Sequence, residues 1–262
     1  MLLAITRDVS PSLAGCELSY LPRTAIDIDI AAAQHRAYQD ALSELGCRVI
    51  ALPAEADLPD SVFVEDVAIV LDEVAIMTRP GAESRRAESA SVANILARYR
   101  PLHAIEAPGT LDGGDVMRIG RTLYVGQSQR SNASGIAQLR DLSGTFGYSV
   151  RAVPIAGCLH LKSAVTQIAD DTLLLQPKWI DRAAFAAARV ADFRIIEIDL
   201  DEPHAANALR IGEGVIFPSC FPRTQQRMEK AGIHAICVDA SELQKAEGAV
   251  TCCSLVFRES AA

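Results

Sequence analysis

Short apolar runs and one amphipathic helical stripe follow one another in an order that repeats along the chain. Apolar runs at 67–71 and 74–77 flank a two-residue polar break, which predicts a β-hairpin. Apolar residues spaced i, i+3, i+4 and i+7 over 92–99 then mark one face of a helix. A further apolar segment at 102–106 predicts a third strand. The pattern therefore predicts a strand–strand–helix–strand module.

The same order of elements returns along the chain. A helix is expected over 133–146 in the next copy, and an alanine-rich helix after Asp181 in the one that follows. A terminal strand over 249–257, joined to the N-terminal strand and helix, completes a fifth copy. The first strands of the copies are expected to begin near Val67, Val116, Ala164, Ala208 and Val250.

Five such modules predict an α/β fold, a five-bladed α/β-propeller with pseudo-fivefold symmetry that fills residues 1–262 as one domain. Pairing of the N- and C-terminal strands would close the ring and remove its open edges. An ordinary parallel α/β sheet is less favoured, because it would not place a hairpin before each helix.

Composition narrows the class of protein. Half of the 262 residues are apolar, which is enough for a substantial core, and no apolar run is long enough to span a bilayer. The net charge of −8 and the lack of a basic tract argue against nucleic-acid and membrane partners. Seven cysteines without CxxC spacing argue against a disulfide scaffold, so a cytoplasmic location is expected. A homodimer is compatible with the sequence, which does not fix the oligomeric state.

Polar residues that enter the first strand of each module should meet near the axis. A nucleophilic cysteine needs a nearby imidazole or cation to hold it as thiolate. The residues expected at this centre are Glu65, Asp66, Asp112 to Asp115, His160, Asn207 and Thr251 to Cys253.

His160 is the candidate partner of the thiol, and Asp112 could orient its imidazole. In an extended strand, Cys252 and Cys253 point to opposite faces, so only one of them can react. Taken alone, His160 is more often structural, and Asp112-Gly-Gly-Asp115 is more often a turn. Their common position in the repeat reverses that preference.

Charged residues of both signs predict the ligand. Glu65 and Asp66 would hold a cationic group, while an arginine of the 78–86 segment and Arg130, at the same position of successive modules, could clamp a carboxylate. A free amino acid with a basic side chain matches both requirements.

Five segments resemble the dimethylargininase family, in the guanidino-group-modifying superfamily. The resemblance implies a propeller that hydrolyses Nω-methylated arginine to citrulline and methylamine or dimethylamine, without a cofactor. It spans nearly the whole chain, in the segments Leu58–Asp66, Thr78–Arg86, Leu111–Asp115, Leu159–Ser163 and Thr251–Ser254.

The resemblance also implies a role for each site residue. Cys252 would be the nucleophile, His160 the acid and base, and Asp112 its partner. The residues implied in substrate binding are Glu65 and Asp66 at the guanidinium, Asp60 at the α-ammonium, Arg85 and Arg130 at the α-carboxylate, Phe63 on the methylene chain, and the Leu18 carbonyl in a lid.

Three alternatives stay open. Enzymes that resemble arginine deiminase carry an acid two residues after the histidine, and here that position is Lys162, which leaves room for methyl groups. A non-catalytic propeller could use the same fold for binding. Zinc held by Cys252, His160 and a carboxylate would replace the thiol mechanism, although the spacing shows no metal signature.

Overall fold

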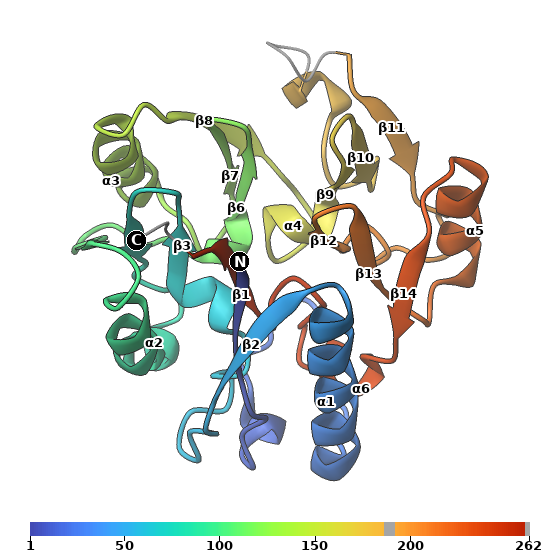
Figure 1. Ribbon diagram of the computed structural model, residues 1–262, viewed down its shortest axis with the longest axis horizontal. Coiled ribbons are helices and arrows are strands. Elements are labelled where there is room, and N and C mark those ends of the chain that lie inside the picture. The colour runs from blue at the N-terminus through green and yellow to red at the C-terminus, as the bar shows by residue number, and fades with distance from the viewer. Residues whose placement is uncertain (186–191, 260–262) are drawn as a thin grey trace.

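The computed structural model describes residues 1–185 and 192–259, and these form five three-stranded sheets around a central axis (Figure 1). In each sheet the first strand pairs antiparallel with the second, and the second pairs parallel with the third. The predicted α/β fold of ββαβ modules is confirmed.

The elements have the following bounds. The strands, sheet by sheet, are β15 (Leu255–Arg258), β1 (Leu2–Arg7) and β2 (Cys47–Leu52); β3 (Ala68–Val70), β4 (Ala75–Met77) and β5 (Leu102–Ala104); β6 (Val116–Ile119), β7 (Thr122–Gln127) and β8 (Ser149–Pro154); β9 (Val165–Ala169), β10 (Thr172–Leu175) and β11 (Arg194–Glu197); β12 (Leu209–Ile211), β13 (Gly214–Pro218) and β14 (Ala235–Val238). The α-helices are α1 (Ile28–Glu44), α2 (Ser89–Leu96), α3 (Ala133–Gly144), α4 (Leu161–Ala164), α5 (Pro222–Lys230) and α6 (Ser241–Gln244). The 3₁₀ helices are η1 (Leu13–Gly15), η2 (Val64–Val67), η3 (Glu83–Glu88), η4 (Gly113–Asp115) and η5 (Arg182–Phe185).

Local sequence explains where these elements begin and turn. The Asp27 carboxylate caps α1 by accepting two backbone N–H groups, and the Asn132 side chain caps α3. Gly120 and Gly212 have φ values of +58° and +59° in the β6–β7 and β12–β13 hairpins, a conformation that favours glycine. The helix predicted after Asp181 begins as η5, and its continuation lies outside the described residues.

The two ends of the chain share one sheet. Strand β1 pairs with β15 antiparallel, with Leu2 opposite Arg258 and Ile5 opposite Leu255. The predicted pairing of the terminal strands is confirmed. It completes the fifth module from the two ends of the chain.

The predicted strand over 249–257 is wrong in its first half, because β15 begins only at Leu255. The Cys252 N–H donates to the Ala249 carbonyl at 3.1 Å, and the Thr251 N–H donates to the Asn207 side chain at 3.1 Å. These bonds close a turn and leave the amides unable to pair with a strand. Both cysteines therefore lie in a turn that leads into β15.

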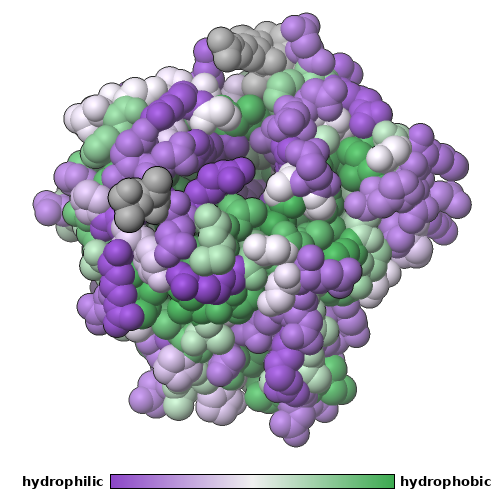
Figure 2. Space-filling view, viewed as in Figure 1, coloured by the Kyte–Doolittle hydropathy of each residue, from purple (hydrophilic) through white to green (hydrophobic). Residues whose placement is uncertain are grey.

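Apolar side chains fill the spaces between neighbouring modules. Ile69 and Ile76 of the second sheet, for example, pack in one cluster with Leu123 of the third sheet and Leu139 of α3. Figure 2 shows hydrophobic residues gathered in the middle of one face and hydrophilic residues along its outer edge. No helix in the described part of the chain is long and apolar enough to cross a bilayer.

Candidate active site

Hydrogen bonds link the segments that lead into the five first strands, and they run from each segment to the next around the axis. Each is a bond between neighbouring modules, and the last returns to the first. The bonds are Gly114 N to Asp66 Oδ1 at 3.0 Å, Leu161 N to Asp115 Oδ1 at 3.0 Å, Asn207 Nδ2 to the Lys162 carbonyl at 3.1 Å, Asn207 Nδ2 to Thr251 Oγ1 at 3.0 Å, and Glu65 N to the Cys252 carbonyl at 3.1 Å.

A small cavity beside these segments is lined by most of the expected residues. Its volume is about 10 Å³, roughly the space of one water molecule. Among the described residues, Leu18, Glu65 and Asp112 lie outside its lining. The expected residues that line it are Asp60, Phe63, Asp66, Arg85, Arg130, His160 and Cys252.

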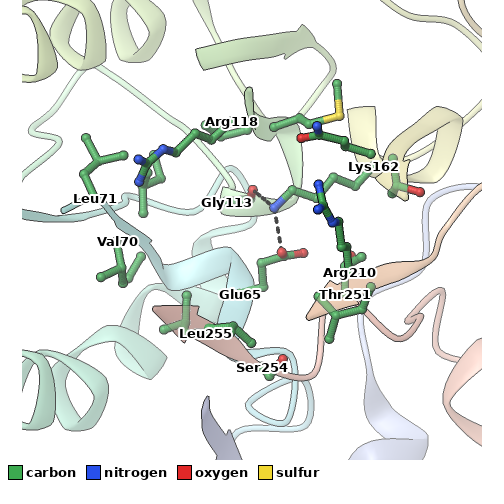
Figure 3. Close-up of a pocket in the computed structure, with 18 of the residues that line it drawn as sticks. Glu65, Val70, Leu71, Gly113, Arg118, Lys162, Arg210, Thr251, Ser254 and Leu255 are labelled. Atoms are coloured by element: carbon green, nitrogen blue, oxygen red, sulfur yellow. Dashed lines mark hydrogen bonds and ion pairs between the residues drawn. The ribbon is translucent and has the colours of Figure 1, made fainter. Parts of the chain in front are cut away.

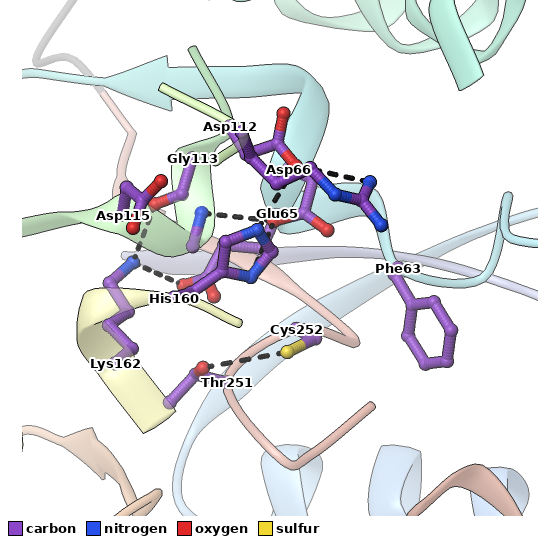
Figure 4. A network of polar contacts seen from close by, with 12 residues as sticks. Phe63, Glu65, Asp66, Asp112, Gly113, Asp115, His160, Lys162, Thr251 and Cys252 are labelled. Atoms are coloured by element: carbon purple, nitrogen blue, oxygen red, sulfur yellow. Dashed lines mark hydrogen bonds and ion pairs between the residues drawn. The ribbon is translucent and has the colours of Figure 1, made fainter. Parts of the chain in front are cut away.

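His160 lies between two buried carboxylates (Figure 4). Its Nε2 is 3.0 Å from Asp112 Oδ2 and its Nδ1 is 3.8 Å from Asp66 Oδ1. Burial alone would lower the pKa of this imidazole, but the Asp66 charge, the hydrogen bond to Asp112 and the Asp115 charge raise that pKa to about 9. Asp112 is wholly buried behind the ring. At neutral pH the imidazole therefore carries a proton that it can donate.

The two adjacent thiols have different surroundings. The Cys252 side chain lines the cavity, and Figure 4 draws its sulfur near the His160 ring, 4.0 Å from the Thr251 hydroxyl. The Cys253 sulfur instead lies 3.4 Å from the Ala249 carbonyl, and its side chain lines a different small cavity together with Tyr38. Burial and the charges of Asp66 and Glu65 raise the pKa of Cys252 to about 12. Before any ligand binds, Cys252 is therefore a thiol.

Arg85 is surrounded by acceptors. Its guanidinium donates to Asp66 Oδ2 at 2.6 Å, to Glu88 at 2.9 and 3.1 Å, and to the carbonyls of Asp60 and Phe63 at 3.3 Å. Although burial would raise the pKa of Asp66, the His160 and Arg85 charges lower it to about 2. Asp66 is therefore ionised and fixed in orientation, and Arg85 faces the cavity with several of its donors already used.

Arg130 differs from Arg85. Its Nη2 donates to the Ser19 hydroxyl at 3.2 Å, and its Nη1 lies 3.7 Å from Asp112. Within 1–185 and 192–259, this buried Nη1 has no hydrogen-bond partner. The Asp60 carboxylate, on the same cavity, accepts the Glu17 N–H at 3.0 Å. This end of the cavity thus offers a cationic donor that is ion-paired to Asp112 but makes no hydrogen bond within the described chain, and a nearby carboxylate.

Phe63 packs closely against Gly248, which precedes the turn that carries Cys252. A Cβ added at Gly248 would lie 2.1 Å from the Phe63 ring, so only glycine fits there. The ring and the turn together form an apolar wall, as expected for a residue that contacts a methylene chain.

Among the described residues, Glu65 does not line the small cavity that contains Cys252. Its carboxylate pairs with Lys162 Nζ at 2.6 Å, and Lys162 also donates to the Gly113 carbonyl. Both residues line a separate cavity of about 330 Å³ among the first strands (Figure 3). The expected contact between Glu65 and a guanidinium stays a prediction, because this carboxylate already has a cationic partner.

The N-terminal loop covers the cavity. The Glu247 carboxylate accepts the backbone N–H groups of Ser19, Tyr20 and Leu21. Glu247 has a φ of +58° and lines the cavity, as does Glu17. Leu18 lies between these contacts as a half-buried residue, and the role expected for its carbonyl stays a prediction.

One group of residues could hold a metal. Asp66, Asp112 and His160 place ligand atoms within 4.8 Å of one another. Cys252, which the zinc alternative requires, is not part of this group within the described chain. Arg85 already binds Asp66, and Asp112 already binds His160, so a metal would have to displace both contacts.

The sequence did not identify Glu88 or Glu247 as site residues, and it assigned no contacts to Asp115 or Lys162. Glu88, Asp115, Lys162 as the partner of Glu65, and Glu247 all make buried or multiple contacts here. Asp115 and Lys162 lie in the motifs already singled out, so their positions were a usable signal. Glu88 and Glu247 are ordinary acids of helical or turn segments and carry no such signal.

Comparisons with known proteins place this geometry in a family. Residues 22–257 match the model of the family described as N,N-dimethylarginine dimethylhydrolase, eukaryotic. The N(G),N(G)-dimethylarginine dimethylaminohydrolase of Streptomyces coelicolor is 39% identical over 98% of this chain and 97% of its own. That of Pseudomonas aeruginosa is 39% identical over 86% of this chain and 87% of its own.

A solved structure agrees. A cysteine-to-serine variant of the Pseudomonas aeruginosa enzyme in complex with citrulline superposes with a TM-score of 0.90, at 36% identity, over 97% of this chain and 98% of that one. The expected resemblance to dimethylargininase is confirmed. The chain belongs to the N,N-dimethylarginine dimethylhydrolase family.

Proposed function

We propose that this protein hydrolyses Nω-methylated L-arginine to L-citrulline and methylamine or dimethylamine, through a covalent intermediate on Cys252. One observation carries the proposal: a single small cavity is lined by the Cys252 thiol, the His160 imidazole and the ionised Asp66, and Asp112 binds the imidazole from outside that lining at 3.0 Å. The names of the relatives and the citrulline bound in one of them support the same reaction.

The first step needs a thiolate. The substrate guanidinium binds beside Asp66 and adds positive charge next to Cys252. This charge offsets the carboxylates that keep the thiol protonated, so the pKa of Cys252 falls and its proton leaves to solvent. The sulfur then attacks the guanidinium carbon and forms a C–S bond.

His160 supplies the next proton. The imidazolium protonates the substituted nitrogen of the tetrahedral adduct, the C–N bond breaks, and the amine leaves. A thiouronium on Cys252 remains, and His160 is now neutral. The hydrogen bond to Asp112 holds the ring in place through both protonation states.

The second step returns the enzyme to its starting state. Neutral His160 takes a proton from water, whose oxygen attacks the thiouronium carbon. The C–S bond then breaks, citrulline is released and Cys252 is free again. This sequence uses groups of the chain and water, and it requires no cofactor.

The other end of the cavity would bind the amino-acid part. Arg130, whose Nη1 makes no hydrogen bond within the described residues, would bind the α-carboxylate, and Asp60 would bind the α-ammonium. Phe63 would pack on the methylene chain. We keep Arg85 as a second contact of the α-carboxylate, and its bonds to Asp66 and Glu88 also orient the guanidinium-binding carboxylate.

The Lys162–Glu65 pair supports a preference for methylated substrates. Lys162 occupies the position at which deiminase-like enzymes carry an acid, and it neutralises Glu65 at 2.6 Å. A buried carboxylate without a partner would need an N–H donor from the substrate, and a dimethylated nitrogen has none. Because Lys162 already pairs with Glu65, the site does not require such a donor. An arginine deiminase activity is the competing function.

The test is citrulline release from Nω,Nω-dimethylarginine, Nω-methylarginine and arginine, with the wild-type protein and with Cys252→Ser and Cys253→Ser. We expect turnover of the methylated substrates, its loss in Cys252→Ser and its retention in Cys253→Ser. Preference for arginine would replace this function with a deiminase. A stoichiometric zinc required for activity would overturn the thiol mechanism.

Three broader proposals accompany this function. Residues 1–262 form one domain, which the pairing of β1 with β15 and the hydrogen bonds around the axis support. All seven cysteines are free thiols, which supports a cytoplasmic location. A homodimer stays a prediction.

A further inference from the structure

Asp115 is a wholly buried carboxylate that the reaction steps above do not use. It ends η4, three residues after Asp112, and it does not belong to the cavity lining among the described residues. Its two oxygen atoms nevertheless accept three hydrogen bonds, from Leu161 N and from the hydroxyls of Ser128 and Ser131. A buried carboxylate with this many donors is held firmly in one place.

One oxygen fixes the backbone at His160. Asp115 Oδ1 accepts the N–H of Leu161, the residue directly after His160, at 3.0 Å. Leu161 is the first residue of α4, where a backbone N–H has no partner within the helix. The carboxylate therefore fixes the backbone where the chain passes from His160 into α4. The position of the His160 side chain depends on that backbone.

The other oxygen reaches two further site residues through serine hydroxyls. Ser131 donates to Asp115 Oδ2 at 2.6 Å and accepts the Asp112 N–H at 3.2 Å. Ser128 donates to the same oxygen at 2.5 Å and accepts the Arg130 N–H at 3.0 Å. Each serine thus connects Asp115 to the backbone of one functional residue.

Gly126, a residue of the neighbouring strand β7, leaves room for the Asp115 carboxylate. A Cβ at Gly126 of β7 would lie 2.6 Å from Asp115 Oδ1, closer than real contacts allow. The strand next to the carboxylate therefore has no side chain at this point, and Asp115 lies directly against its backbone.

We propose that Asp115 is a positioning residue that holds His160, Asp112 and Arg130 in one frame, and so couples the reacting end of the site to the end that binds the α-carboxylate. The inference rests on the proposed function for the roles of these three residues. Asp115 acts through Leu161, Ser131 and Ser128 and does not touch the substrate.

The two serine links make separate predictions. Ser131→Ala removes the link to Asp112, so kcat should fall by about tenfold while KM changes less than about twofold. Ser128→Ala removes the link to Arg130, so KM should rise by about tenfold while kcat changes less than about twofold. Ser134→Ala, a nearby serine of α3 outside the network, is the matched control and should change neither.

Asp115→Asn keeps the size of the side chain and removes its charge. We expect kcat to fall by about ten- to a hundredfold, with KM raised, because both links weaken together. The NMR titration of the His160 imidazole in the free protein gives a readout that needs no turnover. Its midpoint should fall in Asp115→Asn, because the charge that contributes to the raised pKa of His160 is gone.

The outcomes separate the two proposals. If the wild-type protein releases no citrulline, the proposed function fails, and the His160 titration still decides the role of Asp115. An unchanged titration and unchanged kinetics in Asp115→Asn would overturn the inference. The inference would also be overturned if Ser131→Ala and Ser128→Ala changed kcat and KM alike and both lowered the melting temperature. That result would show that the network only stabilises the fold.

Discussion

The two ends of the small cavity are built differently. At the reacting end, His160 and Asp66 are held by partners that are themselves buried, namely Asp112 at 3.0 Å and Arg85 at 2.6 Å. At the recognition end, Arg130 has a buried Nη1 without a hydrogen-bond partner in the described chain, and Asp60 receives an N–H from the covering loop. In the proposed mechanism the reacting end has its imidazole and carboxylates in place before substrate binds and lacks only the thiolate, whereas the recognition end gains its hydrogen bonds from substrate.

This difference predicts where each substitution acts. Groups fixed by buried partners stabilise the transition state, so their loss should appear in kcat. Groups that wait for a ligand contribute binding that is equal in the ground state and the transition state, so their loss should appear in KM.

His160→Gln tests the reacting end most strongly. Glutamine keeps a hydrogen bond to Asp112 but cannot transfer a proton, so kcat should fall by about a hundred- to ten-thousandfold. Steady-state citrulline release measures the effect, and circular dichroism checks the fold. A rise in KM with kcat unchanged would place His160 at the recognition end.

Arg130→Gln tests the recognition end. Loss of a charged hydrogen bond to the α-carboxylate should raise KM by about ten- to a hundredfold, with kcat changed only slightly. Arg85→Gln is the matched comparison, and it should lower kcat as well as raise KM, because Asp66 and Glu88 lose their buried cation and the α-carboxylate loses its second contact. Identical kinetic effects of the two substitutions would remove the distinction between the two ends.

The pH profile tests the protonation of the reacting pair. Below about pH 9 the free site holds two protons, on Cys252 and on His160, whereas attack requires a thiolate beside an imidazolium, which together hold one. We therefore expect kcat/KM to rise by up to about tenfold per pH unit until about pH 9. A profile that is flat from pH 6 to 9 would contradict this proton count.

Glu247→Gln tests the cover of the recognition end and should have the smallest effect. The substitution weakens the acceptor that holds the N–H groups of Ser19, Tyr20 and Leu21, so the closed loop should be less stable. Because these contacts are largely exposed, KM should rise by less than about fivefold, with kcat not lowered. A hundredfold loss of kcat would move Glu247 to the reacting end.

The modules and the convergence of the site follow from the sequence because both depend on local pattern. Each hairpin, helix and strand has its own periodicity and turn residues, as at Gly120 and Asp27. The repeat then places Asp66, Asp112, His160 and Cys252 at equivalent positions. A family resemblance assigned their separate roles.

The remaining features depend on contacts between segments far apart in the chain. Cys252 lies in a turn because the Asn207 side chain takes the Thr251 N–H, and no pattern near Cys252 reveals that partner. Arg85 and Arg130 share a position in the repeat, yet Arg85 pairs with Glu88 of its own 3₁₀ helix η3, whereas the acid near Arg130 is Asp112 of another segment, at 3.7 Å. Residues at equivalent positions of the repeat therefore differ in their tertiary contacts. The pattern of a single sequence does not contain those contacts.

The covalent bond to Cys252 is the most direct test of the account. In His160→Gly, S-methyl-L-thiocitrulline can lose methanethiolate without a proton from the protein, while the missing base slows hydrolysis of the thiouronium. Fragment mass spectrometry of the peptide that contains both cysteines should then place the adduct on Cys252. An adduct on Cys253, or no adduct with a wild-type protein that still releases citrulline, would contradict the proposed mechanism.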